Sequence, residues 1–138
     1  LLVNDDVMLA VRSRAHGAHV GQDDIPALVA RRLLGAAWLG ISTHDLAQID
    51  AAIAAGADYL GFGPCFPTAT KGYDQGLGPA AIEAAVNHCR VPLFAIGGID
   101  ATNIGMLYGL GVRRVAVSRA ILQADDPEAM AAQLREQL

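Results

Sequence analysis

The stretch Leu93-Phe94-Ala95-Ile96-Gly97-Gly98-Ile99 decides the fold of this chain. Its opening residues, 93–96, are apolar without interruption, whereas a strand with one face in water alternates apolar and polar residues. Continuous apolar strands are typical of parallel sheets, in which both faces are covered. The glycine pair ends the run, so we predict a buried parallel strand over residues 93–96.

Similar short runs recur along the 138 residues, each followed by an Ala/Leu-rich segment with helical spacing. The predicted strands cover residues 1–4, 18–21, 38–42, 59–63, 93–96 and 114–117. The predicted helices cover residues 7–15, 26–34, 46–55, 80–89, 101–110 and 127–138. Glycine stands just past several of these helices, where a left-handed residue commonly ends a helix; these are Gly17, Gly35, Gly56 and Gly111.

Six βα units in strict alternation predict an α/β protein with a parallel sheet. Such units build either an open, doubly wound sheet or a barrel. A dinucleotide-binding sheet normally carries a GxGxxG turn, and the Gly61-Phe62-Gly63-Pro64 turn has no third glycine in place. We therefore favour units of the barrel type.

Composition narrows the class of protein. The chain is 53% apolar and 17% charged, as expected for one folded domain. A formal charge of −4 and scattered basic residues argue against nucleic acid as a partner. Cys65 and Cys89 have no metal or redox spacing, and no long apolar span or signal peptide is evident, so we expect reduced thiols, no membrane partner and a cytoplasmic location. His16 and His19 lack the further ligands that a zinc site needs, and we expect structural roles for both.

Acidic residues follow the first two predicted strands, in Asn4-Asp5-Asp6 and Gln22-Asp23-Asp24. In a parallel sheet these two strand ends lie beside one another, where they could hold Mg²⁺, which takes one or two carboxylates together with waters and phosphate oxygens. The same residues are also common helix N-caps. Both interpretations stay open at this point.

The third strand ends in Ser42-Thr43-His44. A polar triplet before a helix is more often a cap than a catalytic group, and no acidic partner for a Ser–His nucleophile is identifiable. We therefore give little weight to nucleophilic catalysis here.

The loop after the fourth strand, residues 61–71, combines glycines and prolines with Thr68, Thr70 and Lys71. Close backbone N–H groups, hydroxyls and an ammonium group are the components of an anion-binding loop. Gly97-Gly98 after the fifth strand and Ser118-Arg119 after the sixth occupy places where barrels often bind phosphate. Two anion sites predict two phosphorylated ligands.

These motifs, in this order, resemble the thiamine-phosphate synthase family, (β/α)8 TIM-barrel enzymes that join hydroxymethylpyrimidine diphosphate to thiazole phosphate. The resemblance spans essentially the whole chain. The segments that carry it are 3–6, 19–24, 40–44, 56–59 with 63–64, 68–71, 95–99 and 115–117.

The resemblance implies a role for each matching position. It implies that Asp5 and Asp24 bind Mg²⁺ with Asn4 beside the metal and diphosphate, and that Ser42, Thr68, Thr70 and Lys71 contact the diphosphate and the pyrimidine. Gly98 and the backbone near Ser118 would hold the thiazole phosphate. Lys71 and Ser42 are thereby implied as catalytic residues of a transferase in thiamine biosynthesis. Besides its two substrates, we consider a second copy of the chain, in a homo-oligomer, as a partner.

The family's first two strands would precede Leu1, and the second normally supplies a Gln-x-Arg-x-Lys segment that this chain lacks. We therefore expect residues 1–138 to form a single partial TIM-barrel domain, corresponding to strands 3–8 of an N-terminally truncated chain that is inactive by itself. A thiazole tautomerase of the same superfamily is the alternative enzyme. A non-catalytic phosphate-binding remnant is the alternative from another class.

Overall fold

The computed structural model describes residues 1–68 and 74–138 and contains one sheet of six parallel strands. The strands are β1 (Leu2–Asn4), β2 (Gly17–Val20), β3 (Trp38–Thr43), β4 (Tyr59–Phe62), β5 (Leu93–Ile96) and β6 (Val115–Ala116). The helices are α1 (Val7–Ser13), α2 (Ala27–Leu34), α3 (Leu46–Ala54), α4 (Pro79–His88), α5 (Ile104–Gly109), α6 (Arg119–Leu122) and α7 (Pro127–Glu136).

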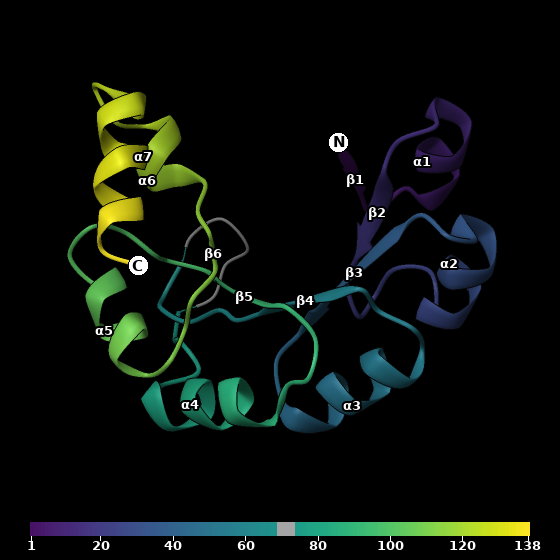
Figure 1. Cartoon of the computed structure of the whole chain (residues 1–138), viewed down its shortest axis with the longest axis horizontal. Coiled ribbons are helices and arrows are strands. Elements are labelled where there is room, and N and C mark those ends of the chain that lie inside the picture. The colour runs from purple at the N-terminus through teal and green to yellow at the C-terminus, as the bar shows by residue number, and fades with distance from the viewer. Residues whose placement is uncertain (69–73) are drawn as a thin grey trace.

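The strands lie in the sheet in the order β1-β2-β3-β4-β5-β6, each paired in parallel with the next. Figure 1 shows that the sheet curls into an open arc, with the helices along its outer side. A doubly wound sheet would instead reverse its strand order and carry helices on both faces. The structure therefore confirms the predicted α/β class and the barrel-type arrangement.

The core lies between the outer face of the sheet and the helices that cover it. Leu39, Leu60 and Phe62 of the strands are fully buried, and so are Ile49 of α3 and Ile82 of α4. Burial of side chains of this size contributes roughly 1.5–3 kcal/mol each before conformational entropy is counted. The core thus fixes the curvature that brings the carboxyl ends of the strands together.

One predicted glycine cap was wrong, and one helix was not predicted. Gly17 does not end α1: it is the first residue of β2, and Arg14, at φ 53°, is the C-cap. A Cβ at position 17 would collide with the Trp38 backbone, so this glycine permits close approach of β3. The short helix α6 was not predicted, since its four residues are too few to show a helical period.

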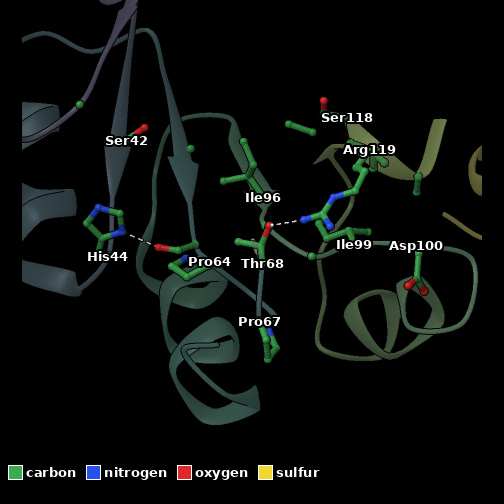
Figure 2. A pocket seen from close by; sticks show the side chains of 18 of the residues that line it. Ser42, His44, Pro64, Pro67, Thr68, Ile96, Ile99, Asp100, Ser118 and Arg119 are labelled. Carbon is green, nitrogen blue, oxygen red and sulfur yellow. Dashed lines mark hydrogen bonds between the residues drawn. The ribbon is translucent and has the colours of Figure 1, made fainter. Parts of the chain in front are cut away.

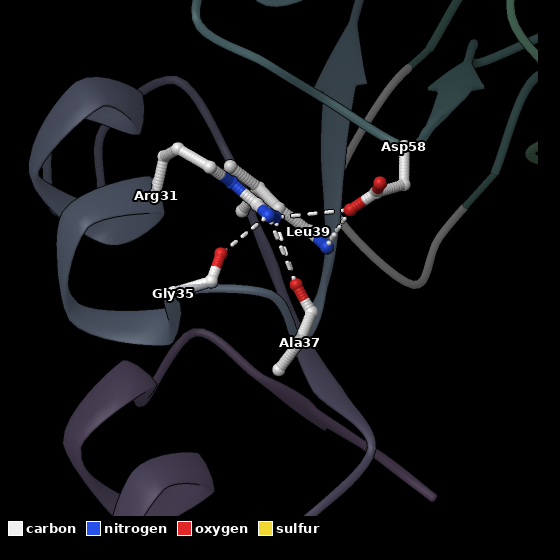
Figure 3. A network of polar contacts seen from close by, with 5 residues as sticks. All are labelled: Arg31, Gly35, Ala37, Leu39 and Asp58. Atoms are coloured by element: carbon white, nitrogen blue, oxygen red, sulfur yellow. Dashed lines mark hydrogen bonds and ion pairs between the residues drawn. The ribbon is translucent and has the colours of Figure 1, made fainter.

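A polar cluster ties the amino-terminal ends of the strands to α2 (Figure 3). The guanidinium of Arg31 donates to Ala37 O at 2.8 Å and to Asp58 Oδ2 at 3.0 Å. The same carboxylate oxygen accepts from the Leu39 N–H at 2.7 Å. This cluster lies at the amino-terminal end of the strands, which in barrels serves stability rather than catalysis. Among the described residues, no helix is both long and apolar enough to cross a membrane.

Candidate functional site

A pocket of about 1300 Å³ lies over the carboxyl ends of the strands. Most of the described residues predicted for the site line it, namely Asp5, Asp24, Ser42, Thr68, Gly98 and Ser118. Asn4 ends β1 with an exposed side chain and is not among the described lining residues. Thr70 and Lys71 lie outside the described residues. The pocket therefore brings together candidate residues from the ends of all six strands, and Asn4 is the described candidate that does not line it.

The acidic end of the pocket is formed by the loops after β1 and β2. Asp5 takes a left-handed conformation, φ 66°, and its N–H donates to His19 O at 2.8 Å. Asp24 accepts the Gly21 N–H at 2.6 Å through Oδ2, and Asp23 also lines the pocket. Three carboxylates thus come from adjacent strand ends. Asp23 was not singled out from the sequence.

The capping alternative holds for only one of these aspartates. Asp6 caps α1, since its Oδ1 accepts the Leu9 N–H at 2.8 Å. The N-cap of α2 is instead Pro26, with no side-chain hydrogen bond, so Asp24 does not cap that helix. Asp5 and Asp24 are therefore the pair whose carboxylates are not engaged in helix capping.

The donor set at this end suits a hard divalent cation. Within residues 1–68 and 74–138, no three His, Cys, Asp or Glu side chains group closely enough to hold a metal by themselves. Mg²⁺ does not require such a cage, because it commonly binds one or two carboxylates and fills its octahedron with water and phosphate oxygens. The oxygen-only chemistry of Asp5 and Asp24 fits that mode of binding.

Ser42 is held by a polar chain that sequence analysis missed. His19 Nε2 lies 2.8 Å from Ser42 Oγ, and His19 Nδ1 lies 3.0 Å from the Tyr59 hydroxyl. A Cβ at Gly40 would collide with both rings, so this glycine makes room for the pair. Burial raises the pKa of Tyr59, which favours its neutral hydroxyl. His19 therefore orients Ser42, beyond the passive structural role we expected.

The triplet Ser42-Thr43-His44 does not cap α3. Asp45 is the cap, and its side chain accepts the Gln48 N–H at 2.8 Å. His44 Nδ1 donates to the carbonyl oxygen of Gly63, which fixes the ring at the pocket wall (Figure 2). Thr43 is fully buried and donates to Gly61 O at 3.0 Å.

The two predicted anion loops pack directly against each other. The Cys65 N–H donates to Ile96 O at 2.9 Å, and the Phe66 N–H donates to Gly97 O at 3.0 Å. Gly98, at φ +64°, is so close that an added Cβ would lie 2.5 Å from Pro67 O. The loops after β4 and β5 are therefore one interlocked wall, and the two candidate anion sites belong to one pocket.

The Gly97-Gly98 turn is held from behind by the start of α5. Asn103 Nδ2 donates to Gly98 O at 2.9 Å, and its Oδ1 accepts the Asp100 N–H at 3.0 Å. Asp100 in turn accepts from Thr102, which closes an Asx turn. This turn explains why α5 begins at Ile104 rather than at the predicted residue 101.

Arg119 completes the wall on the side of β6. It is the first residue of α6, and its Nη2 lies 3.5 Å from Thr68 Oγ1 (Figure 2). Ser118 precedes it and also lines the pocket. The contact joins the element after β6 to the loop after β4.

Some of the missed residues carried a sequence signal. His19 sits opposite Gly40 in the register of β2 and β3, and Gly40 sits opposite Tyr59 in the register of β3 and β4. A glycine between two large polar residues on neighbouring strands indicates inward-facing side chains that need space. That signal requires the strand register, which the sequence does not provide directly.

The curved parallel sheet, with its strands in sequential order, defines an α/β protein of the barrel class. The polar pocket at the carboxyl ends of its strands has glycine turns in its wall, which are the donor groups of a phosphate-binding site. The family model described as thiamine monophosphate synthase matches residues 1–121. The chain belongs to this family.

Individual relatives agree with the family assignment. The chain is 44% identical over 138 residues to the thiamine-phosphate synthase of Nostoc punctiforme, covering 99% of this chain and 39% of that protein. It is 48% identical over 133 residues to that of Mycolicibacterium gilvum, covering 96% and 56%. A thiamine phosphate pyrophosphorylase structure from Pyrococcus furiosus superimposes with a TM-score of 0.89 at 32% identity, covering 99% and 65%. The chain thus spans less than two thirds of the length of these relatives.

Proposed function

We propose that this chain contributes the active-site wall of a thiamine-phosphate synthase, a transferase that moves the hydroxymethylpyrimidine group from its diphosphate to thiazole phosphate and releases pyrophosphate. The observation that carries the proposal is the single pocket in which acidic strand ends face two interlocked glycine loops. Two anionic substrates that must react with each other need two anion subsites in one cavity.

Asp5 and Asp24 would hold Mg²⁺ at the acidic end of the pocket. When bound, the ion would stabilise the negative charge that grows on the departing diphosphate. Asp23, on the same loop as Asp24, adds a carboxylate that can bind a metal-bound water. Asn4 would need to turn toward the pocket to take its predicted place beside the metal.

Ser42 and Thr68 would donate hydroxyl hydrogen bonds to the diphosphate and the pyrimidine region, together with Thr70 and Lys71. His19 and Tyr59 keep Ser42 in place, at 2.8 Å and 3.0 Å along the chain of contacts. Fixed donors aimed at a developing charge are an efficient source of catalysis, because they do not reorganise during the reaction.

Gly98 and Ser118 would bind the phosphate of the thiazole, so that its ring nitrogen faces the pyrimidine carbon. The carbon–oxygen bond to the diphosphate breaks, the electron-rich aminopyrimidine stabilises the resulting cation, and the nitrogen lone pair forms the new bond. No general base is needed. The tautomerase alternative involves one phosphate and proton transfer, and the acidic end formed by Asp5, Asp23 and Asp24 is better explained by a diphosphate substrate with its metal.

The test is turnover in a chimera in which this chain replaces the matching segment of the Mycolicibacterium gilvum relative. We expect the chimera to form thiamine phosphate with Mg²⁺ present. Lys71→Ala should lower the single-turnover rate by about 10²-fold or more, the effect of removing one charge-stabilising donor. Arg90→Gln removes a positive charge away from the described pocket lining and is the matched control. A folded chimera without turnover, or Lys71→Ala at the rate of Arg90→Gln, would contradict the proposal.

A further inference from the structure

We infer that Arg119 is the residue that makes this pocket select a phosphorylated thiazole over the corresponding thiazole alcohol. The inference rests on the proposed function, because it concerns the second substrate of that site. It assigns a side-chain ligand to a subsite otherwise built from the backbone near Gly98 and from Ser118.

The charges of the described pocket lining favour a cation on the side of the thiazole phosphate. The described lining residues include five carboxylates, those of Asp5, Asp23, Asp24, Asp74 and Asp100. Arg119 is the one Arg or Lys among the same described residues. A phosphate monoester carries up to two negative charges, and burying it beside carboxylates without a cation is costly. The guanidinium supplies the opposite charge within the lining itself.

The geometry places this cation at the phosphate-side wall. Arg119 Nη2 lies 3.5 Å from the Thr68 hydroxyl, and Figure 2 shows the side chain directed across the pocket toward Thr68, near Ile99. Thr68 directly follows Pro67, whose carbonyl oxygen would lie 2.5 Å from a Cβ on Gly98. Through Thr68 and Pro67, the guanidinium therefore lies on the same pocket wall as the Gly98 turn. A phosphate oxygen bound by this guanidinium would form a shorter, charge-assisted hydrogen bond than the 3.5 Å contact with Thr68.

The chemistry of a guanidinium explains the selection. Its planar array of N–H groups matches two oxygens of a phosphate group, whereas a neutral hydroxyl offers one weak acceptor. Hydrogen bonds to charged groups change affinity by roughly 10- to 100-fold. Arg119 therefore adds affinity for the monoester and almost none for the alcohol.

Isothermal titration of this chain with the thiazole phosphate and with its alcohol tests the inference. We expect Arg119→Gln to lower the affinity for thiazole phosphate by about 10-fold or more. Its affinity for the alcohol should stay within about twofold of the unsubstituted protein's, since no charged hydrogen bond is lost. Arg119→Lys keeps the charge and loses the paired geometry, so its affinity for thiazole phosphate should lie between those of the unsubstituted protein and Arg119→Gln. Arg90→Gln is the matched control for net charge and should change neither affinity.

Thr68→Val reports on positioning, because it removes the hydroxyl and keeps the shape. When Arg119 is present, Thr68→Val should lower the preference for the monoester over the alcohol. In a protein that already carries Arg119→Gln, Thr68→Val should not change that preference. The inference is overturned if Arg119→Gln weakens both ligands equally or neither. If the chimera lacks turnover while Arg119 still controls the preference for the monoester, the proposed reaction is refuted. The inference about the phosphate subsite is supported in that case.

Discussion

Replacement of Gly98 by alanine probes the joint between the two glycine loops. Gly98 has φ +64°, and a Cβ there would lie 2.5 Å from Pro67 O and 2.8 Å from Phe66 Cβ. Ordinary contact begins at 3.4 Å, so the loops must separate by about 0.9 Å, which is 3.4 minus 2.5. Left-handed backbone costs alanine about 1–2 kcal/mol, and overpacking adds about 1–3 kcal/mol.

Alanine also lowers the entropy of the unfolded chain, which returns about 0.4–1 kcal/mol. We therefore expect Gly98→Ala to reduce the free energy of unfolding by about 3 kcal/mol, from the sum of these effects. Two other glycines separate the contributions. Gly56 has φ +86°, and the nearest atom to an added Cβ would belong to the flexible Arg31 side chain at 3.5 Å, an ordinary contact. Gly105 lies in α5, with nothing within 4 Å of an added Cβ.

The assay is urea unfolding of the variants, compared at unchanged denaturant slope. Gly56→Ala carries only the left-handed backbone strain and should lose about 1 kcal/mol, while Gly105→Ala, in a helix, should gain about 0.5–1 kcal/mol. The excess loss in Gly98→Ala over Gly56→Ala measures the contact between the loops. Equal losses in those two variants would refute the interlocked wall.

Other predictions concern the interior and the opposite end of the sheet. Thr43→Val removes a buried donor to Gly61 O and should cost about 1–2 kcal/mol in urea unfolding. Asp58→Asn weakens the charged contact with Arg31 and should cost about 1–2 kcal/mol, without changing ligand affinity. Burial raises the pKa of Cys65 to about 11 from 9.0, so the folded protein keeps a proton that the unfolded chain loses. Stability should thus fall by about 2–3 kcal/mol between pH 9 and 11, and Cys65→Ala should remove that decline.

The strands were predictable from the sequence because parallel strands are continuous apolar runs. The run at β5 matched the predicted residues 93–96, and β3 differed by a single residue at its end, Thr43. Helix boundaries were less accurate, because side-chain bonds decide them. The Asx turn at Asp100 delays α5, and the four-residue α6 has no measurable period.

The position of a candidate residue at the pocket was predictable where its residue type marked the end of an apolar run, and it was not where pairing across strands decides the contact. Asp24 and Gly98 could be placed from the ends of apolar runs, since function gathers at the carboxyl ends of parallel strands. The contact of His19 with Ser42 depends on the register of β2, β3 and β4, and the interlocking of the two loops depends on backbone hydrogen bonds. Neither leaves a local pattern in the sequence.

The most direct measurement of the central claim is titration of this chain with inorganic pyrophosphate and Mg²⁺, followed by thiazole phosphate. One pocket with two anion subsites predicts that pyrophosphate binding requires Mg²⁺ and that thiazole phosphate then binds without displacing it, one of each per chain. Asp24→Asn should lower the affinity for pyrophosphate with Mg²⁺ and leave the affinity for thiazole phosphate unchanged. Mutual displacement of the two ligands, or pyrophosphate binding that is indifferent to Mg²⁺ and Asp24, would contradict the account.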